Sequence, residues 1–123
     1  MGDSGRREHP IDGPTVLIAA AKASVPGRRL PTLLVVVQRE LVDEYESYRR
    51  QFECVADDDR AIFLTDRSHW TALGDRLGFS DRETDAVRRA HTQQLRRLGS
   101  TTDRREEFET ALEIREAVVI GRD

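Results

Sequence analysis

Residues 68–98, SHWTALGDRLGFSDRETDAVRRAHTQQLRRL, decide the fold because their pattern predicts two amphipathic helices joined by a tight turn. Ser80 and Glu83 form the pattern of a capping box, in which each side chain bonds a free backbone N–H at a helix start. Gly78 stands where the end of a helix favours a left-handed residue. The stretch therefore predicts one helix that ends at the glycine and a second that begins after the serine.

The flanking sequence predicts further helices. Apolar residues recur every three or four positions through 31–54, as one face of a long helix requires. The run Leu33–Val37 alone could be a buried strand, and the run 61–64 is too short to classify as strand or helix. The remaining helices are expected at about 15–25 and 103–120.

Together these elements predict an all-α fold. We expect a single-domain bundle of about five helices, with the long 31–54 helix at its centre. Residues 1–14, which carry glycines, prolines and mixed charges, are expected to form a flexible tail ahead of a helical domain at 15–123. The apolar stretch 117–120 is either part of the core or a docking surface for a partner or a second copy of the chain.

Composition excludes several classes of protein. The single cysteine, Cys54, excludes an internal disulfide and a multi-cysteine metal site. No apolar run reaches the roughly 18 residues of a membrane-spanning helix. The N-terminus lacks the apolar segment of a signal peptide. We therefore expect a cytoplasmic protein with no membrane contact.

The charge pattern is uneven. Lysine and arginine total 20, and Lys22 is the only lysine. This bias is typical of a GC-rich genome or a salt-adapted cell, and it also suits arginine forks that bind phosphate. Residues 40–66 hold an excess of acids, whereas 67–105 hold an excess of arginines. Such an asymmetry permits either a basic face toward nucleic acid or contact with an acidic partner.

The candidate binding residues are the arginines on the outer surface of the predicted helix 81–98. They could follow the phosphates of a nucleic acid or contact a protein partner. A solvated, ion-paired surface is the alternative, because Asp85 can neutralise two of them. The residues are Arg82, Arg88, Arg89, Arg96 and Arg97.

No pattern of catalysis or cofactor binding is found. The three histidines are far apart in sequence and have no companions with metal-ligand spacing. His91 falls on the apolar face of its helix, which favours a hydrogen-bonded core histidine. Cys54 lies among acidic residues, which lower the reactivity of a thiol. The sequence therefore predicts a protein that is not an enzyme and that holds no cofactor or metal.

The segment LGDRLGFSDRETDAV resembles the LAxxLGVSxxTV pattern of helix-turn-helix DNA-binding domains. Leu73, Leu77, Gly78 and Ser80 stand in the matching positions. The segment departs from the pattern at two places, because glycine replaces alanine at position 74 and a threonine stands at the aliphatic anchor position 84. The resemblance implies that the helix 81–98 would contact DNA.

Residues 70–87 also resemble the WxxLAxxLGL…I core of death-fold adaptor domains, through Trp70, Leu73, Leu77 and Val87. That resemblance implies a protein-interaction bundle. The arginine-rich style of the chain and the segment EFETALEIREAVVIG (107–121) are also similar to small uncharacterised haloarchaeal all-α proteins. The resemblance to the haloarchaeal proteins implies no activity.

The sequence favours a non-enzymatic regulatory or adaptor protein that acts through protein–protein contacts. The partner would be another protein or a second copy of the chain. The alternative is a helix-turn-helix-like nucleic-acid-binding protein that uses the basic helix 81–98 to bind DNA.

Overall fold

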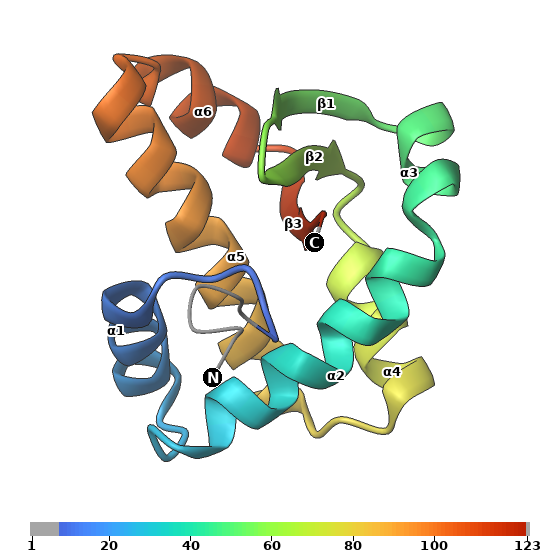
Figure 1. Cartoon of the computed structure of the whole chain (residues 1–123). Helices are drawn as coiled ribbons and strands as arrows, with labels where there is room; N and C mark the ends of the chain where they lie inside the picture. Colours follow the sequence, from blue (N-terminus) through green and yellow to red (C-terminus); the bar gives the residue numbers. More distant parts are fainter. Residues whose placement is uncertain (1–7, 123) are drawn as a thin grey trace, which may run out of the picture.

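The structure, a computed structural model, describes residues 8–122. Within this part, six helices surround a three-stranded antiparallel sheet (Figure 1). The fold is therefore α+β, and the all-α prediction is wrong. The helices are α1 (Gly13–Ala23), α2 (Arg29–Asp43), α3 (Tyr45–Gln51), α4 (His69–Leu77), α5 (Asp81–Thr102) and α6 (Arg105–Leu112). The strands are β1 (Glu53–Asp57), β2 (Arg60–Thr65) and β3 (Glu116–Gly121).

Helix α5 is the centre of the fold. Its 22 residues contact α1, α2, α4, α6 and β3, and it crosses the molecule beside the sheet (Figure 1). The helix was predicted to end at residue 98, but it continues through Gly99 to Thr102. A Cβ at position 99 would lie 3.0 Å from Cδ2 of Phe108 and 3.3 Å from Cα of Arg105. Glycine therefore allows the close approach of α6 rather than breaking α5.

The predicted long helix at 31–54 is divided. Helix α2 ends at Asp43, and Glu44 interrupts the helix with φ −108° and ψ 14°. Helix α3 then ends at Gln51, and the next residue, Phe52, is extended (φ −128°, ψ 157°) and leads into β1. Tyr45 and Tyr48 still pack on the core after the interruption, so the apolar spacing continued while the backbone changed direction.

Two further differences from the predicted fold, at residues 61–64 and after Leu112, are explained by the sheet. The run 61–64, left unassigned from the sequence, belongs to the central strand β2 and is buried throughout. The last predicted helix stops at Leu112, and the residues after it form β3, which pairs with β2 in the register Ala61↔Ile120. Consecutive β-branched residues buried on both sides favour a strand at this position. Residues 117–120 are fully buried, which confirms that they belong to the core.

Side chains complete the outer edge of β3. The indole N–H of Trp70 donates to the carbonyl of Ala117 (3.2 Å). The backbone N–H of Val119 donates to Nδ1 of His91 (2.9 Å). The Gln38 amide then bonds both backbone groups two residues further along the strand (3.0 Å each). These contacts replace the bonds of a neighbouring strand, because buried backbone groups must be paired.

The two helices and the turn of 68–98 form as predicted, but the second helix continues to Thr102. The Ser80 hydroxyl accepts a bond from the N–H of Glu83 (3.1 Å), and the Glu83 carboxylate accepts one from the N–H of Ser80 (2.9 Å). Gly78 is left-handed, with φ 77°. This capping box and turn fix where α5 begins, and so they fix which of its residues face the other elements.

The predicted tail at 1–14 lies partly outside the described residues, which begin at 8. Within the described part, Ile11 is buried, and the backbone N–H of Asp12 donates to the side chain of Gln94 on α5 (2.9 Å). None of the helices within 8–122 combines the length and apolar content that crossing a bilayer would need.

Candidate functional site

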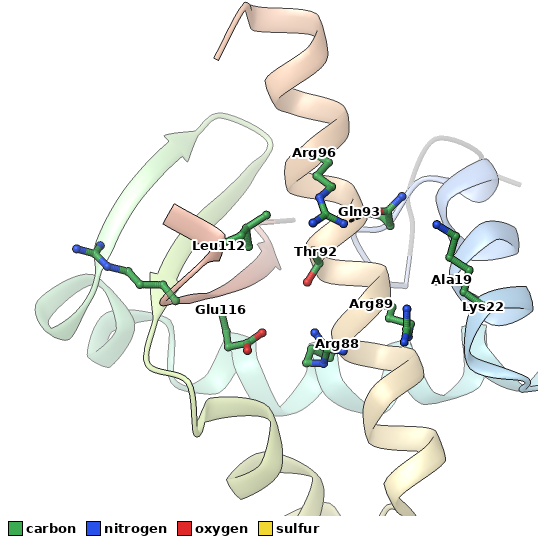
Figure 2. Close-up of a pocket in the computed structure, with 10 residues that line it drawn as sticks. Ala19, Lys22, Arg88, Arg89, Thr92, Gln93, Arg96, Leu112 and Glu116 are labelled. Atoms are coloured by element: carbon green, nitrogen blue, oxygen red, sulfur yellow. Dashed lines mark hydrogen bonds between the residues drawn. The ribbon is translucent and has the colours of Figure 1, made fainter. Parts of the chain in front are cut away.

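Three of the five predicted arginines come together at a pocket beside α5. Arg88, Arg89 and Arg96 line a hollow of about 260 Å³, which Figure 2 shows from close up. Arg82 and Arg97 are not part of its lining. The five predicted arginines therefore do not form one surface, because they face different neighbours.

The pocket lies where three parts of the chain meet. Helix α5 supplies its back wall, and α1 contributes Lys22. Arg115, in the connection from α6 to β3, also lines the pocket, and Glu116 at the start of β3 faces α5 from the other side (Figure 2). These positions are distant in sequence and are brought together because α5 packs against both α1 and β3. The lining thus carries five cationic side chains and one carboxylate.

Carboxylates around the pocket hold most of its arginines in place. Asp85 binds Arg88 (Nη2–Oδ1, 2.8 Å) and Arg89 (Nε–Oδ2, 2.7 Å) at the same time. Burial raises the pKa of Asp85, but the bonds from the two arginines together outweigh this and hold the pKa below its ordinary value. One carboxylate therefore neutralises only part of the charge of two guanidinium groups.

The other cations of the pocket differ in their pairing. Arg96 makes two bonds to the Glu109 carboxylate, at 2.8 and 3.3 Å. Arg115 pairs with Glu53 at 2.7 Å. Lys22 forms no ion pair with any residue of 8–122. The pocket therefore keeps an excess of positive charge.

A buried hydroxyl without a hydrogen-bond partner also lines the pocket. Thr92 is 8% exposed, and within 8–122 its Oγ1 has no partner. A threonine inside a helix often bonds the carbonyl four residues earlier, but this one does not. Leaving a buried hydroxyl unpaired costs about 1–3 kcal/mol. In Figure 2 Thr92 and Glu116 both reach into the space between α5 and the start of β3.

Glu116 is the one acid of the lining. Burial raises the pKa of its carboxyl, and attraction from Arg88 and Arg67 opposes that rise. Within residues 8–122 this carboxyl group makes no hydrogen bond or ion pair, so it remains available as a hydrogen-bond partner for a bound group. Its presence limits the positive potential without reversing it.

The remaining predicted arginines lie elsewhere. Arg97 pairs with Asp12 (3.2 Å) near the start of α1. Arg82 is exposed in the first turn of α5 and pairs with no residue of the described chain. Sequence reasoning missed Lys22, Thr92, Arg115 and Glu116 as pocket residues. A signal existed for one of them, since Arg88, Thr92 and Arg96 follow at intervals of four and share one helix face.

His69, which is partly buried, and His91, which is fully buried, form a separate polar group beside the core. His69 Nε2 lies 2.6 Å from the hydroxyl of Tyr48, and His91 bonds the edge of β3. Burial lowers the pKa of His69 to about 4 and that of His91 to about 3. Both rings contact Trp70. Within 8–122 no three His, Cys, Asp or Glu side chains gather in a way that could hold a metal ion.

The fold and the pocket define the class: a small α+β protein in which one long helix supports a cationic pocket. More specifically, the chain belongs to the family described as a domain of unknown function (DUF8048), whose pattern matches residues 9–122. No curated protein and no solved structure matches the chain.

Proposed function

We propose that this protein is a non-enzymatic regulatory or adaptor protein that acts through protein–protein contacts, and that its pocket receives an acidic group of the partner. The observation that carries the proposal is the excess of cationic side chains around one hollow, lined as well by the unpaired hydroxyl of Thr92. A cytoplasmic location and a salt-adapted source, both expected from the composition, belong to the same proposal.

The shape of the site favours a protruding group over a flat surface. The cations of the pocket come from α1, α5 and the connection to β3, so they surround a hollow rather than line a row. Cationic walls around a concave site concentrate the positive potential inside it. An acidic side chain of a partner could enter such a hollow while the rest of the partner contacts its rim.

The pairing of the arginines disfavours a DNA backbone as the partner. Phosphate tracking requires cations that release counterions when they bind. Arg88, Arg89, Arg96 and Arg97 instead bond acids of the same chain. Each of these bonds would have to be exchanged on binding a duplex, which reduces the gain from each phosphate.

Nucleic-acid binding through α5 is the second candidate. It is favoured by Arg82, which is exposed and unpaired within the described residues at the start of the helix. In helix-turn-helix domains the first residues of the second helix contact base edges. The support for nucleic-acid binding thus rests on this one arginine.

Fluorescence anisotropy with two labelled probes, a glutamate-rich peptide and a duplex DNA, separates the candidates. Arg89→Gln removes a pocket cation, and Arg82→Gln removes a cation from the same helix outside the pocket. We expect the peptide to bind and Arg89→Gln to weaken it, with Arg82→Gln close to wild type. Salt-sensitive DNA binding that Arg82→Gln weakens would instead support the second candidate. Failure of both probes to bind would contradict both.

A further inference from the structure

We propose that the acidic group bound in the pocket is a phosphate monoester. This inference rests on the proposed function, since it concerns the same pocket and names the chemistry of the group that enters it. Three independent features support it: the ion pairs of the arginines, the buried hydroxyl of Thr92, and the volume of the hollow.

The ion pairs of the pocket favour a dianion over a carboxylate. Arg88 and Arg89 share Asp85, and Arg96 binds Glu109 in a fork. A carboxylate ligand would exchange one such pair for an equivalent one, so we expect it to bind more weakly than a dianion. A phosphate monoester carries a charge of about −1.5 to −2 at neutral pH. It therefore gains more from the same guanidinium groups than the carboxylate that it displaces.

The donors of the pocket also suit a tetrahedral ligand. A phosphate monoester presents three strong acceptor oxygens, whereas a carboxylate presents two. Guanidinium forks approach such oxygens two at a time. The hydroxyl of Thr92 is a further donor that has no acceptor within the described chain. Arginines on two sides and a hydroxyl between them would bond separate oxygens of one phosphate.

The volume of the hollow fits a small group. At about 260 Å³ it lies below the range of roughly 300–1,000 Å³ for pockets that enclose drug-sized ligands. A phosphorylated side chain or a small phosphate ester could place its phosphate there and leave the remainder outside. The surrounding guanidinium groups can adjust, since the side chains of Arg88, Arg89 and Arg96 are 36–46% exposed.

The hydroxyl of Thr92 is covered in the free protein, because its oxygen exposes less than 1 Å². Binding must therefore move the side chains above it. In the absence of ligand the hydroxyl only destabilises the fold, since a buried donor without an acceptor loses its bonds to water. A residue that lowers stability and has no structural partner is typical of a binding site.

The matched variant Thr92→Val separates the two roles, because valine keeps the shape and removes the hydroxyl. We expect Thr92→Val to melt at the same temperature as wild type or higher. We expect it to bind a phosphoserine peptide at least about tenfold more weakly, the size of one lost charge-assisted bond. Arg89→Gln should show a similar loss of binding, and Arg82→Gln should behave as wild type.

Isothermal titration calorimetry with four probes completes the test: a phosphoserine peptide, the same peptide with glutamate in place of phosphoserine, inorganic phosphate, and phosphoserine as the free amino acid. Tighter binding of the phosphoserine peptide than of its glutamate counterpart, lost in Thr92→Val, supports the proposal. Equal binding by the free phosphate ester assigns a small molecule as the source, and weaker binding assigns a phosphorylated protein.

Two results overturn the inference. If the glutamate peptide binds as tightly as the phosphoserine peptide, the pocket receives an ordinary acidic group, and the proposed function survives without this refinement. If none of the four probes binds, or if Thr92→Val and Arg89→Gln bind them like wild type, both the inference and the pocket as the binding site are wrong.

Discussion

The ring Nδ1 of His91 accepts a hydrogen bond from the backbone N–H of Val119 at 2.9 Å. A side chain of the central helix thereby takes the place of a strand at the edge of β3. The bond joins positions on α5 and β3 that are both fully buried. It also explains why a polar residue stands on the apolar face of α5, where the sequence predicted a hydrogen-bonded core histidine.

Replacing His91 with leucine should destabilise the protein. The variant keeps an apolar side chain of similar reach but leaves the N–H of Val119 buried without an acceptor. We expect the free energy of unfolding to fall by about 1–3 kcal/mol. Urea denaturation measures this value, and hydrogen exchange should show the Val119 amide less protected. A variant as stable as wild type would mean that this bond contributes nothing.

Trp70 should contribute through packing more than through its hydrogen bond. Trp70→Phe keeps an aromatic ring between His69 and His91 and removes the bond to Ala117. We expect it to cost about 1–3 kcal/mol, the penalty for an unpaired buried carbonyl. Trp70→Ala should cost about 3–5 kcal/mol because it also leaves a cavity. Denaturant unfolding measures both values. Equal losses of unfolding free energy in the two variants would contradict a larger contribution from packing than from the hydrogen bond.

Stability should fall in mild acid because of the partly buried His69 and the fully buried His91. Burial lowers the pKa of His69 to about 4 and of His91 to about 3, whereas an unfolded histidine titrates near 6.5. The unfolded chain therefore takes up protons first as the pH falls. The contribution of the neutral histidines to the free energy of unfolding is complete above about pH 6.5. It decreases toward pH 4, by about 1.4 kcal/mol per pH unit for each histidine.

The same titration has an internal control. His91→Leu removes one of the two groups, so its free energy of unfolding should fall less steeply between pH 6.5 and 5 than that of wild type. Equal slopes for the two proteins would show that His91 does not remain neutral in the fold.

Gly74 and Thr84 should show strong energetic coupling. A Cβ at position 74 would overlap Oγ1 of Thr84 and lie 2.9 Å from its Cγ2. Gly74→Ala should therefore destabilise by about 1–3 kcal/mol through overpacking, although alanine is the better helix former. Adding Thr84→Ala should restore most of the loss. A double-mutant cycle measures the coupling, and simple additivity of the two changes would contradict it.

That contact also explains the two departures from the helix-turn-helix pattern. The pattern has alanine at the first position and an aliphatic residue at the second. This chain has glycine at 74, and the side chain of Thr84 fills the space that a Cβ would take. The glycine at 74 and the threonine at 84 therefore compensate for each other. The helix pair could be predicted from sequence because its caps, turn and spacing are local features.

The strands could not be predicted because their pairing is not local. The run at 61–64 and the run at 117–120 are each too short to distinguish a strand from a buried helical segment. Both are strands because they pair with each other, and the run at 61–64 also pairs with β1. The apolar spacing through 31–54 also continued past the interruption at Glu44, so it gave no sign that the helix ends.

The candidate site could be predicted in part for the same reason. Arg88, Arg89 and Arg96 were found because they share one helix. Lys22 and Arg115 were missed because only the packing of α1 and β3 on α5 brings them to that helix. The spacing of Thr92 places it on the helix face of Arg88 and Arg96, but the sequence does not show that its hydroxyl is buried without a partner.

The most direct test of the central claim is to map where an acidic ligand binds. Backbone amide NMR, recorded while a phosphoserine peptide is added, reports every affected position at once. We predict shifts concentrated around Lys22, Arg88 to Arg96, and Leu112 to Glu116, with the amide of Arg82 unchanged. Shifts centred on Arg82 and the start of α5, with the pocket unaffected, would contradict the account.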